Sequence, residues 1–438
     1  MTRAVCFDVT HLVSRLGVVA PSGFDKVDLA YGRHFVTADK GPFVHYGFTA
    51  PHVLSRQRAQ SLVGLADAAH WQSERATSAT TSDAVFAGVS KALTEGPVLP
   101  PSGHPSFQPP KSRRPLIAAA RLEAARLKYR LVDDRLKIPE GAIYLNVAQH
   151  LFEFHRLFAW LDRRSDVRPV FLIHDLLPLD YPEFFENGDE AKFERRMAMA
   201  LTRARGLIFT SEAVRARVVD ERRRRRLPDV PTLVAPLPST LEVLAPEAVF
   251  DAALAAVPYF VTIGTLEPRK NHLLLLGIWR QLAEAASKSG ATPPRLVLVG
   301  GRGWENEQVL DVLDRGRWTR HSVMEAAGLA SGSLTRLVAN ARALLMPSFA
   351  EGYGLPLVEA LTLGTPVVAT DAAVFREVTQ GRAMYLGPLD GVAWSRAILE
   401  LADLNSHASR AAREAAHQFT PPTWPAYFEA VTRFLDEL

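Results

Sequence analysis

The sequence is poor in cysteine, and Cys6 is the single one among 438 residues. A lone thiol excludes a disulfide within the chain and a cysteine-based zinc site. Cys6 lies in the apolar run of residues 4–7, where a small packed side chain is its simplest role. Such sparing use of cysteine is typical of the reducing cytoplasm, so we expect a cytoplasmic protein.

Long apolar runs and metal-binding patterns are also missing. No stretch approaches the ~18 apolar residues that a membrane-spanning helix needs, and Asp8 breaks the short apolar run near the start that a secretory signal would require. The sequence shows no Asp-x-Asp element and no His, Cys or carboxylate cluster with metal-ligand spacing. We expect a protein that is soluble, or at most lies on a membrane surface, and a site without metal.

Charge is unevenly placed, although the net charge is only +4. Residues 111–138 hold nine Lys or Arg against three acids, and residues 215–226 hold seven Arg against two acids. Such stretches favour nucleic acid, anionic lipid or phosphorylated substrates, or they form a solvated helix face. No nucleic-acid recognition motif accompanies them, so we expect no nucleic acid among the partners.

The length and the strand pattern predict two domains. A chain of 438 residues exceeds what one hydrophobic core usually serves, and apolar β-rich runs alternate with helical patterns, as in parallel sheets covered by helices. Strands are predicted at residues 4–8, 142–147, 169–174, 206–210 and 232–235, and then at residues 259–264, 295–300, 343–347, 366–370 and 383–386. Prolines interrupt the chain after residue 235, which places the domain boundary near residue 245. Two doubly wound α/β domains facing each other across a cleft result, with ligands at the carboxyl ends of the strands.

Residues 73–138 form an irregular insertion in this rhythm. Residues 73–82 are rich in Ser, Thr and Ala, and residues 96–115 contain seven prolines, so a mobile loop or linker is expected there. Residues 115–138 predict a basic amphipathic helix with Leu116, Ala120, Ala124, Leu127, Leu131 and Ile138 near one face. Its apolar face would dock onto its own domain or lie on an anionic membrane.

The most informative segment is the turn at residues 347–360, PSFAEGYGLPLVEA. Gly352 and Gly354 let the backbone bend and approach a ligand. The amides of the helix that starts near Pro356 suit a diphosphate. Glu351 and Glu359 flank the turn and can both face the cleft, although by spacing alone the pair could equally be a helix-start Glu and a solvent-facing Glu.

This segment resembles the signature of the retaining glycosyltransferases of family 4, in which two Glu residues are separated by seven others. Gly352, Tyr353, Gly354 and Leu355 match the family's wording, and the later stretches GTPVVAT and REV follow its course. The resemblance covers most of residues 140–438. It implies a GT-B fold with two Rossmann-like domains: residues 1–245 binding the acceptor and residues 246–420 binding the nucleotide sugar. Residues 421–438 are then a helix that crosses back to the first domain.

The resemblance also implies roles for the second domain. Glu351 would bind hydroxyls of the transferred hexose, and Glu359 the ribose. The stretch GTLEPRKN, from Gly264 to Asn271, resembles the family's donor-phosphate element. There Arg269 and Lys270 would neutralise the charge that builds on the leaving diphosphate. Thr265 stands where many relatives have Arg, and Gly300, in VGGRGW, lines the base pocket or forms a purely structural turn.

In the first half, the stretch FLIHDLLPLDYPE resembles the family's strand-end element. This implies that His174 bonds the transferred sugar or orients the acceptor. Asp175 would cap a helix or help to activate the acceptor hydroxyl. Gly23 stands in the place of the family's acceptor loop, although the usual G-[IV]-G-R wording is absent.

Together these features predict a metal-independent, retaining hexosyltransferase whose catalytic residues are His174, Arg269, Lys270 and Glu351. It would use a nucleotide sugar as co-substrate and no other cofactor. The wording looks closest to bacterial mannosyl- and rhamnosyltransferases of surface-polysaccharide assembly, including lipopolysaccharide, which makes GDP-mannose the first donor prediction. A glycan or lipid-linked acceptor is expected, with the enzyme cytoplasmic and peripheral to the inner membrane.

Two other classes stay open. One is a nucleotide-sugar epimerase or phosphorylase on the same fold, although such epimerases do not usually carry the paired Glu element and no Lys–cofactor site of a phosphorylase is seen. The other is a non-catalytic scaffold that binds a nucleotide sugar or a membrane surface, which Thr265 and the basic stretches keep in view. The sequence carries no signal for an oligomeric state.

Overall fold

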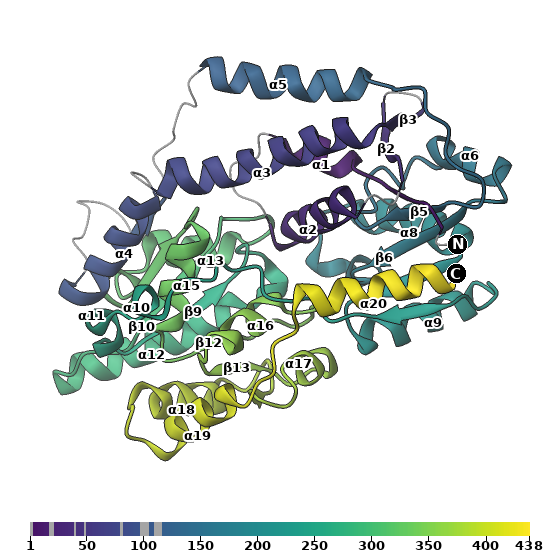
Figure 1. The fold of residues 1–438 in the computed structure, drawn as a ribbon. Coiled ribbons are helices and arrows are strands. Elements are labelled where there is room, and N and C mark those ends of the chain that lie inside the picture. The colour runs from purple at the N-terminus through teal and green to yellow at the C-terminus, as the bar shows by residue number, and fades with distance from the viewer. Residues whose placement is uncertain are drawn as a thin grey trace.

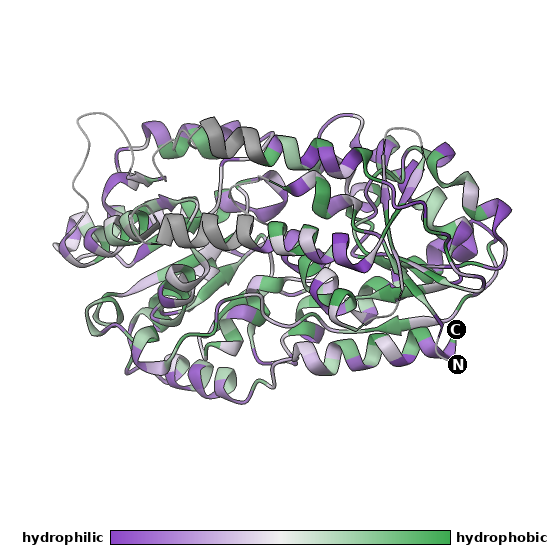
Figure 2. Ribbon diagram, turned by 45° about the horizontal axis from the view of Figure 1, so that its top comes forward, coloured by the Kyte–Doolittle hydropathy of each residue, from purple (hydrophilic) through white to green (hydrophobic). Residues whose placement is uncertain are grey.

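The computed structural model describes residues 3–16, 22–38, 41–47, 50–78, 82–96, 105–108 and 116–438. Two parallel sheets form the centres of two α/β domains, and the strands are largely hydrophobic where they are buried (Figure 2). Both termini lie at the end of the first domain (Figure 1). The GT-B arrangement of two Rossmann-like domains, expected from the sequence, is confirmed.

The first sheet has the order β1-β5-β6-β7-β8, with all neighbours parallel. Its strands are β1 (Val5–Phe7), β5 (Ile143–Asn146), β6 (Arg168–Ile173), β7 (Gly206–Phe209) and β8 (Thr232–Val234). All five were predicted from their apolar runs; the first four are almost entirely buried, as in strands covered on both faces, and β8 at the edge is half-buried. The antiparallel pair β2 (Phe43–Tyr46) and β3 (Pro51–Leu54) was not predicted, and it lies beside β1 through a bridge between Asp8 and Val44.

The second sheet has the order β14-β13-β12-β9-β10-β11-β4. Five of its strands were predicted: β9 (Tyr259–Ile263), β10 (Arg295–Val299), β12 (Leu344–Met346), β13 (Val367–Thr370) and β14 (Met384–Leu386). The prediction missed β11 (Val323–Ala326), whose short sequence VMEA includes an acid. Glu325 is nonetheless buried, because Arg302 pairs with it at 2.8 Å.

The helices surround these sheets (Figure 1). In the first domain they are α1 (Thr10–Arg15), α2 (Gly23–Thr37), α3 (Arg56–Ser78), α5 (Leu116–Leu131), α6 (Ala159–Arg163), α7 (Leu177–Asp180), α8 (Asp189–Arg203) and α9 (Glu212–Arg224), with the 3₁₀ turns η1 (His155–Phe158) and η2 (Pro182–Phe184). In the second they are α10 (Pro246–Val249), α11 (Ala252–Ala256), η3 (Pro268–Lys270), α12 (His272–Ser289), α13 (Glu307–Arg315), α14 (Thr319–Ser322), α15 (Ser331–Ala339), α16 (Leu355–Thr362), α17 (Ala373–Val378), α18 (Gly391–Ala402) and α19 (His407–His417).

The insertion is more regular than its composition suggests. The α3 helix runs on through Ser78, and α4 (Ser82–Glu95) lies against the second domain, where Arg295 donates to the carbonyls of Ala92 and Leu93. After it, β4 (Ser106–Phe107) pairs in parallel with β11 and so extends the second sheet. The expected loop or linker is therefore wrong for residues 73–78, which continue α3, and for β4, which gains its structure by pairing with β11 in the other half of the chain. Residues 79–81, 97–104 and 109–115 lie outside the described residues.

The predicted basic helix forms, but it is shorter than expected, and the described side chains of its apolar face do not dock onto their own domain. The α5 helix ends at Leu131, not at residue 138. Leu127 and Leu131 are 53% and 60% exposed, whereas Tyr129 is buried. Arg126 donates to the Ser14 carbonyl, so a polar contact helps to attach this helix to α1. The apolar contact comes from Tyr129, because an aromatic side chain contributes large buried area even from a basic stretch.

The last helix, α20 (Trp424–Glu437), crosses back to the first domain as predicted (Figure 1). Its Tyr427 hydroxyl lies 2.8 Å from the Tyr31 hydroxyl in a buried hydrogen bond. Phe428 stacks on His34 with ring centroids 4.1 Å apart. Aromatic packing therefore attaches the end of the chain to α2.

Candidate active site

A cleft of about 690 Å³ opens between the domains at the carboxyl ends of their strands. In open α/β sheets this edge is where ligands bind. All fourteen residues that were predicted for the site line this one cavity: Gly23, His174, Asp175, Gly264, Thr265, Arg269, Lys270, Gly300, Glu351, Gly352, Tyr353, Gly354, Leu355 and Glu359. The structure thus brings the predicted residues together, while their individual roles stay predictions.

An ion cluster forms the floor of the cleft on the side of the second domain. Glu351 Oε2 lies 2.7 Å from Arg269 Nη1, and Glu351 Oε1 lies 2.6 Å from Lys270 Nζ. Arg269 also pairs with Glu267 at 2.5 Å and donates to the Ala350 carbonyl. The η3 turn after β9 and the turn after β12 are therefore joined through charged side chains.

The backbone positions this cluster. Asn271 ends η3 in the left-handed conformation (φ 55°), which Asn tolerates better than most residues. Its amide donates to the carbonyls of Pro347 and Pro388, at 3.2 and 2.8 Å. In the same region, the Phe349 amide donates to the Arg269 carbonyl. The sequence EPRKN is thus a turn that fixes where its two cations point.

The cations control the ionisation of Glu351. Burial alone would raise the pKa of this carboxyl, but Lys270 and Arg269 outweigh burial and lower its pKa to about 2. Two cations, Arg269 and Lys270, face two carboxylates, Glu351 and Glu267, so their formal charges cancel. An incoming diphosphate would have to share the cations with Glu351, whose oxygens each retain a further lone pair for a sugar hydroxyl.

The Gly-rich turn brings the second domain against the first. A Cβ atom on Gly352 would lie 2.7 Å from the Asp175 Cβ and 2.8 Å from the His174 carbonyl oxygen, which is too close for any side chain. Gly354 caps α16 with φ 95°, a region that favours glycine, and Pro356 follows in the first turn. The Tyr353 hydroxyl donates to the Leu237 carbonyl and fixes the turn from behind.

His174 lies across the cleft at the end of β6. Its Nε2 lies 2.9 Å from the Val147 carbonyl, an acceptor, so Nε2 carries the proton. Burial lowers the pKa of His174 to about 4, so the ring is neutral near pH 7. In this tautomer Nδ1 is a hydrogen-bond acceptor, which suits a sugar hydroxyl. Phe24 packs on the ring, with centroids 4.4 Å apart.

Asp175 lies directly before Leu176, the N-cap residue of α7, so its predicted N-cap role is wrong. Its Oδ1 nonetheless accepts from the Leu177 amide at 3.1 Å. Burial raises the pKa of its carboxyl, and nearby Arg269 opposes that shift only in part. A carboxyl with a raised pKa at the cleft can also exchange a proton with an acceptor hydroxyl.

Glu359 lies deeper, in α16. It is 5% exposed, and its Oε1 accepts from Thr240 Oγ1 at 2.7 Å. Burial raises the pKa of Glu359, with Lys26 acting against that shift. Thr240 and Lys26 also line the cleft, and the prediction missed both as site residues. The capping box of Ser22 and Asp25 at the start of α2 was the signal that could have placed Lys26 at this edge.

Gly264 and Gly300 let the ends of β9 and β10 approach each other. Gly300 has φ 154°, and a Cβ atom there would lie 2.0 Å from the Gly264 carbonyl oxygen. The glycines are therefore needed for the backbone itself, which favours the structural reading of the VGGRGW turn beside its place on the cleft wall. Within the described residues, no group of three or more His, Cys, Asp or Glu side chains could hold a metal ion. No helix among those residues is both long and apolar enough to span a membrane.

Comparison with known proteins agrees with this geometry. Residues 257–403, about a third of the chain, match the family described as Glycosyl transferases group 1. The chain is 30% identical over 258 residues to the serotype-specific mannosyltransferase WbdA of Escherichia coli, covering 56% of this chain and 31% of WbdA. It is 36% identical over 148 residues to the O-antigen chain mannosyltransferase B of E. coli, covering 34% of this chain and 37% of that protein. The chain thus spans about a third of the length of these curated relatives.

Solved structures share the whole fold. The Anabaena protein Alr3699/HepE, solved with UDP and glucose, superposes with a TM-score of 0.57 at 16% identity and full coverage of both chains. A trehalose-phosphate synthase from Burkholderia vietnamiensis gives 0.54 at 13% identity, covering all of this chain and 98% of the other. At such low identity, these likenesses establish the GT-B fold alone.

Proposed function

We propose, from the match of residues 257–403 to the family described as Glycosyl transferases group 1, that this chain is a retaining hexosyltransferase that needs no metal. It would move a hexose from a nucleotide sugar, bound in the second domain, to a glycan or lipid-linked acceptor held against the first. The observation that carries the proposal is the ion cluster of Arg269, Lys270 and Glu351, which faces His174 across one cleft.

The geometry supports separate roles for the groups that bind the diphosphate and for the acceptor. Arg269, Lys270 and the amides at the start of α16 would hold the diphosphate and stabilise the negative charge that grows as its bond to the anomeric carbon breaks. The acceptor hydroxyl would attack that carbon from the face that the diphosphate leaves. Its proton would pass to the departing phosphate oxygen, and the anomeric configuration would be kept.

Two side chains would position the hexose in this reaction. His174 Nδ1 would accept from one sugar hydroxyl, and Glu351 would accept from others through lone pairs that the cations leave open. Glu359, beside Thr240, would accept from the ribose. Since the cations and His174 belong to different domains, the site is complete only when the domains meet, as they do at Gly352.

Mannose from GDP-mannose is the donor that we propose. Two relatives carry mannosyltransferase in their printed names, and those names refer to a serotype and to an O-antigen chain. Assembly of a bacterial surface polysaccharide is the corresponding proposal for this chain.

The exposed Leu127 and Leu131 beside the exposed Lys128 on α5 support a further proposal, that this helix rests on the anionic inner face of the membrane. Sedimentation with vesicles containing anionic lipid should bring down the wild type, and much less of a Leu127→Gln, Leu131→Gln variant.

Incubation of the purified chain with GDP-mannose tests the central proposal. Nucleotide release should exceed that of a Lys270→Met variant by at least about a hundredfold, the usual loss when one charge-stabilising group is removed. Lys288→Met, an exposed lysine of α12 in the same domain, is the matched control and should behave as wild type.

The other function classes predict different results. A scaffold would be stabilised by GDP in a thermal shift experiment without releasing nucleotide from any donor. An epimerase would convert GDP-mannose into another nucleotide sugar without an acceptor. If a panel of nucleotide sugars causes neither release nor stabilisation, the proposed function is wrong.

A further inference from the structure

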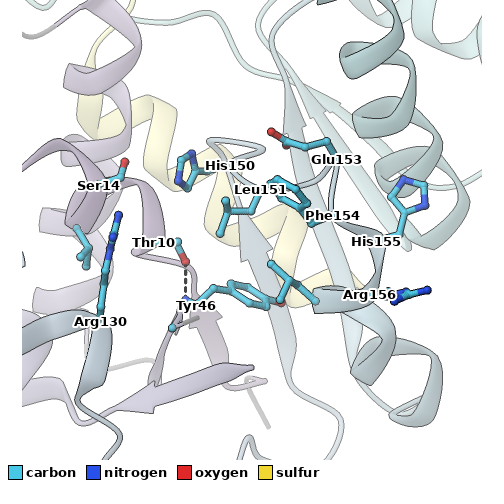
Figure 3. A pocket seen from close by; sticks show the side chains of 13 residues that line it. Thr10, Ser14, Tyr46, Arg130, His150, Leu151, Glu153, Phe154, His155 and Arg156 are labelled. Carbon is cyan, nitrogen blue, oxygen red and sulfur yellow. Dashed lines mark hydrogen bonds between the residues drawn. The ribbon is translucent and has the colours of Figure 1, made fainter. Parts of the chain in front are cut away.

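A second cavity, of about 650 Å³, lies in the first domain and has no role in the site described above. Residues after β1, β2 and β5 line it, so it opens at the same edge of the first sheet as His174 does. We call it the β5 pocket, after the loop that supplies Leu151 and Phe154. Figure 3 shows Arg130 and Ser14 on one side and Leu151, Phe154 and Tyr46 on the other.

Several polar side chains of the β5 pocket already have partners inside the protein. Ser14 Oγ donates to the His11 carbonyl at 2.7 Å, and the Tyr46 hydroxyl accepts from Trp160 Nε1 at 2.8 Å. Both oxygens of Glu153 accept from Arg196, at 3.0 and 3.1 Å. A sugar chain would need such groups for its hydroxyls. Because these groups are engaged, the wall formed by Tyr46, Leu151 and Phe154 is mainly apolar.

The loop that forms this wall is held in an unusual conformation. Gln149 and Leu151 have φ angles of 51° and 65°, which is rare for residues with a side chain and costly for a bulky one. The loop is held by the Asn146 side chain, which accepts from the Gln149 amide at 2.8 Å, while Gln149 Nε2 donates to the Leu172 carbonyl at 2.7 Å. As a result Phe154, a large apolar side chain, remains 55% exposed at the pocket.

A row of rings joins the β5 pocket to the interdomain cleft. His150 lines the β5 pocket, and its ring centroid lies 5.7 Å from that of His11. The ring centroids of His11 and Phe24 lie 5.1 Å apart, and those of Phe24 and His174, in the cleft, lie 4.4 Å apart. The rings of His11 and Phe24 therefore lie between the two sites, and an acceptor whose sugar meets His174 would pass over these two rings to place its other end in the β5 pocket.

We propose that the β5 pocket binds the apolar aglycone of the acceptor, so that the substrate class is a lipid-linked sugar and not a free glycan. This inference rests on the proposed function, because it assumes that an acceptor sugar meets His174. Arg130 and Arg156 also line the pocket, and their charge complements a phosphate placed between the sugar and the lipid. The α5 helix, which supplies Arg130, also exposes Leu127 and Leu131 toward solvent.

Calorimetric titration with octyl α-mannoside and methyl α-mannoside tests this assignment, in the presence of GDP and below the concentration at which the octyl compound forms micelles. The octyl compound should bind wild type at least about tenfold more tightly, because burying even part of its chain removes several methylenes from water. Phe154→Ala should lose most of that advantage, and Phe154→Asp should lose all of it. Phe250→Ala, which removes a phenylalanine that is 68% exposed in the second domain, should keep it.

Equal binding of the two compounds by wild type would overturn the assignment, as would an octyl advantage that survives Phe154→Asp. A gain in affinity from a longer methyl oligomannoside that equals the gain from the octyl chain would also overturn it, in favour of a glycan site. These titrations measure binding without turnover. If the chain released no nucleotide from GDP-mannose, the proposed function would be contradicted, but the comparison of octyl and methyl mannoside binding would still test the β5 pocket.

Discussion

Replacing Glu351 by Gln isolates the electrostatic contribution of the ion cluster, because the amide keeps the shape of the side chain and removes its charge. In the folded protein the pKa of Glu351 falls from an ordinary 4.5 to about 2. At roughly 1.4 kcal/mol for each factor of ten, this corresponds to about 3 kcal/mol of stability near pH 7. Glu351→Gln should therefore lower the free energy of unfolding by about that amount, consistent with the usual loss when one member of a buried ion pair is removed.

The sign of the pH dependence follows from the lowered pKa. The unfolded chain binds a proton on Glu351 below pH 4.5, whereas the folded chain does so only near pH 2. The stabilisation is therefore complete above pH 4.5 and is lost as the pH falls toward 2. Urea titrations give the free energy of unfolding of wild type and of Glu351→Gln. The difference between the two should be about 1 kcal/mol smaller at pH 3.5 than at pH 7.

A control and a ligand measurement complete this test. Asp371→Asn removes one member of an exposed pair with Arg376 and should leave stability unchanged, because exposed pairs contribute little. GDP should bind Glu351→Gln at least as tightly as wild type, since the diphosphate no longer shares the cations with a carboxylate, while transfer should fall sharply. The reasoning would be refuted if Glu351→Gln lowered the free energy of unfolding by less than about 1 kcal/mol at pH 7. It would also be refuted if the variant no longer bound GDP.

Three further changes test other parts of the site. His174→Ala should reduce transfer severely and leave GDP binding nearly intact, because the ring lies on the acceptor side of the cleft; unchanged turnover would remove His174 from the mechanism. Gly352→Ala should lower kcat with little loss of stability, since its Cβ would collide with Asp175 and push the domains apart; small-angle scattering should show a larger radius of gyration. Tyr427→Phe should cost about 1 to 2 kcal/mol in urea, because it leaves the buried Tyr31 hydroxyl without its partner.

The donor half of the site was predictable because its chemistry is local in sequence. Gly352, Gly354 and Pro356 specify a turn and a helix start within five residues, and the EPRKN turn ends on an Asn that adopts φ 55°. Each element needs only its own strand and helix to point into the cleft. For such elements, the residue types at fixed spacing largely determine the local backbone structure.

Elements that depend on distant partners were not predictable. Ser106 and Phe107 become a strand because β11 presents an open edge, and β11 in turn tolerates Glu325 because Arg302 pairs with it. Likewise, Tyr129 is the buried side chain of α5, although Leu127 fits the apolar pattern better. In each case a contact with a remote segment overrides the local preference.

The β5 pocket could not be predicted from the sequence, although Gly23, His174 and Asp175 of the acceptor side were predicted. Its wall depends on Leu151 at φ 65°, and Leu carries no local signal for that conformation. The conformation exists because Asn146, Gln149 and the Leu172 carbonyl hold the loop from three directions. A nucleotide diphosphate can be recognised by glycines and a helix start, a chemistry that short motifs encode. An apolar aglycone offers no charge or hydrogen bond to recognise, so the wall that would bind it is defined by shape and by apolar surface. Those properties arise only when segments from β1, β2, β5 and α5 meet, and they must be sought in the folded chain.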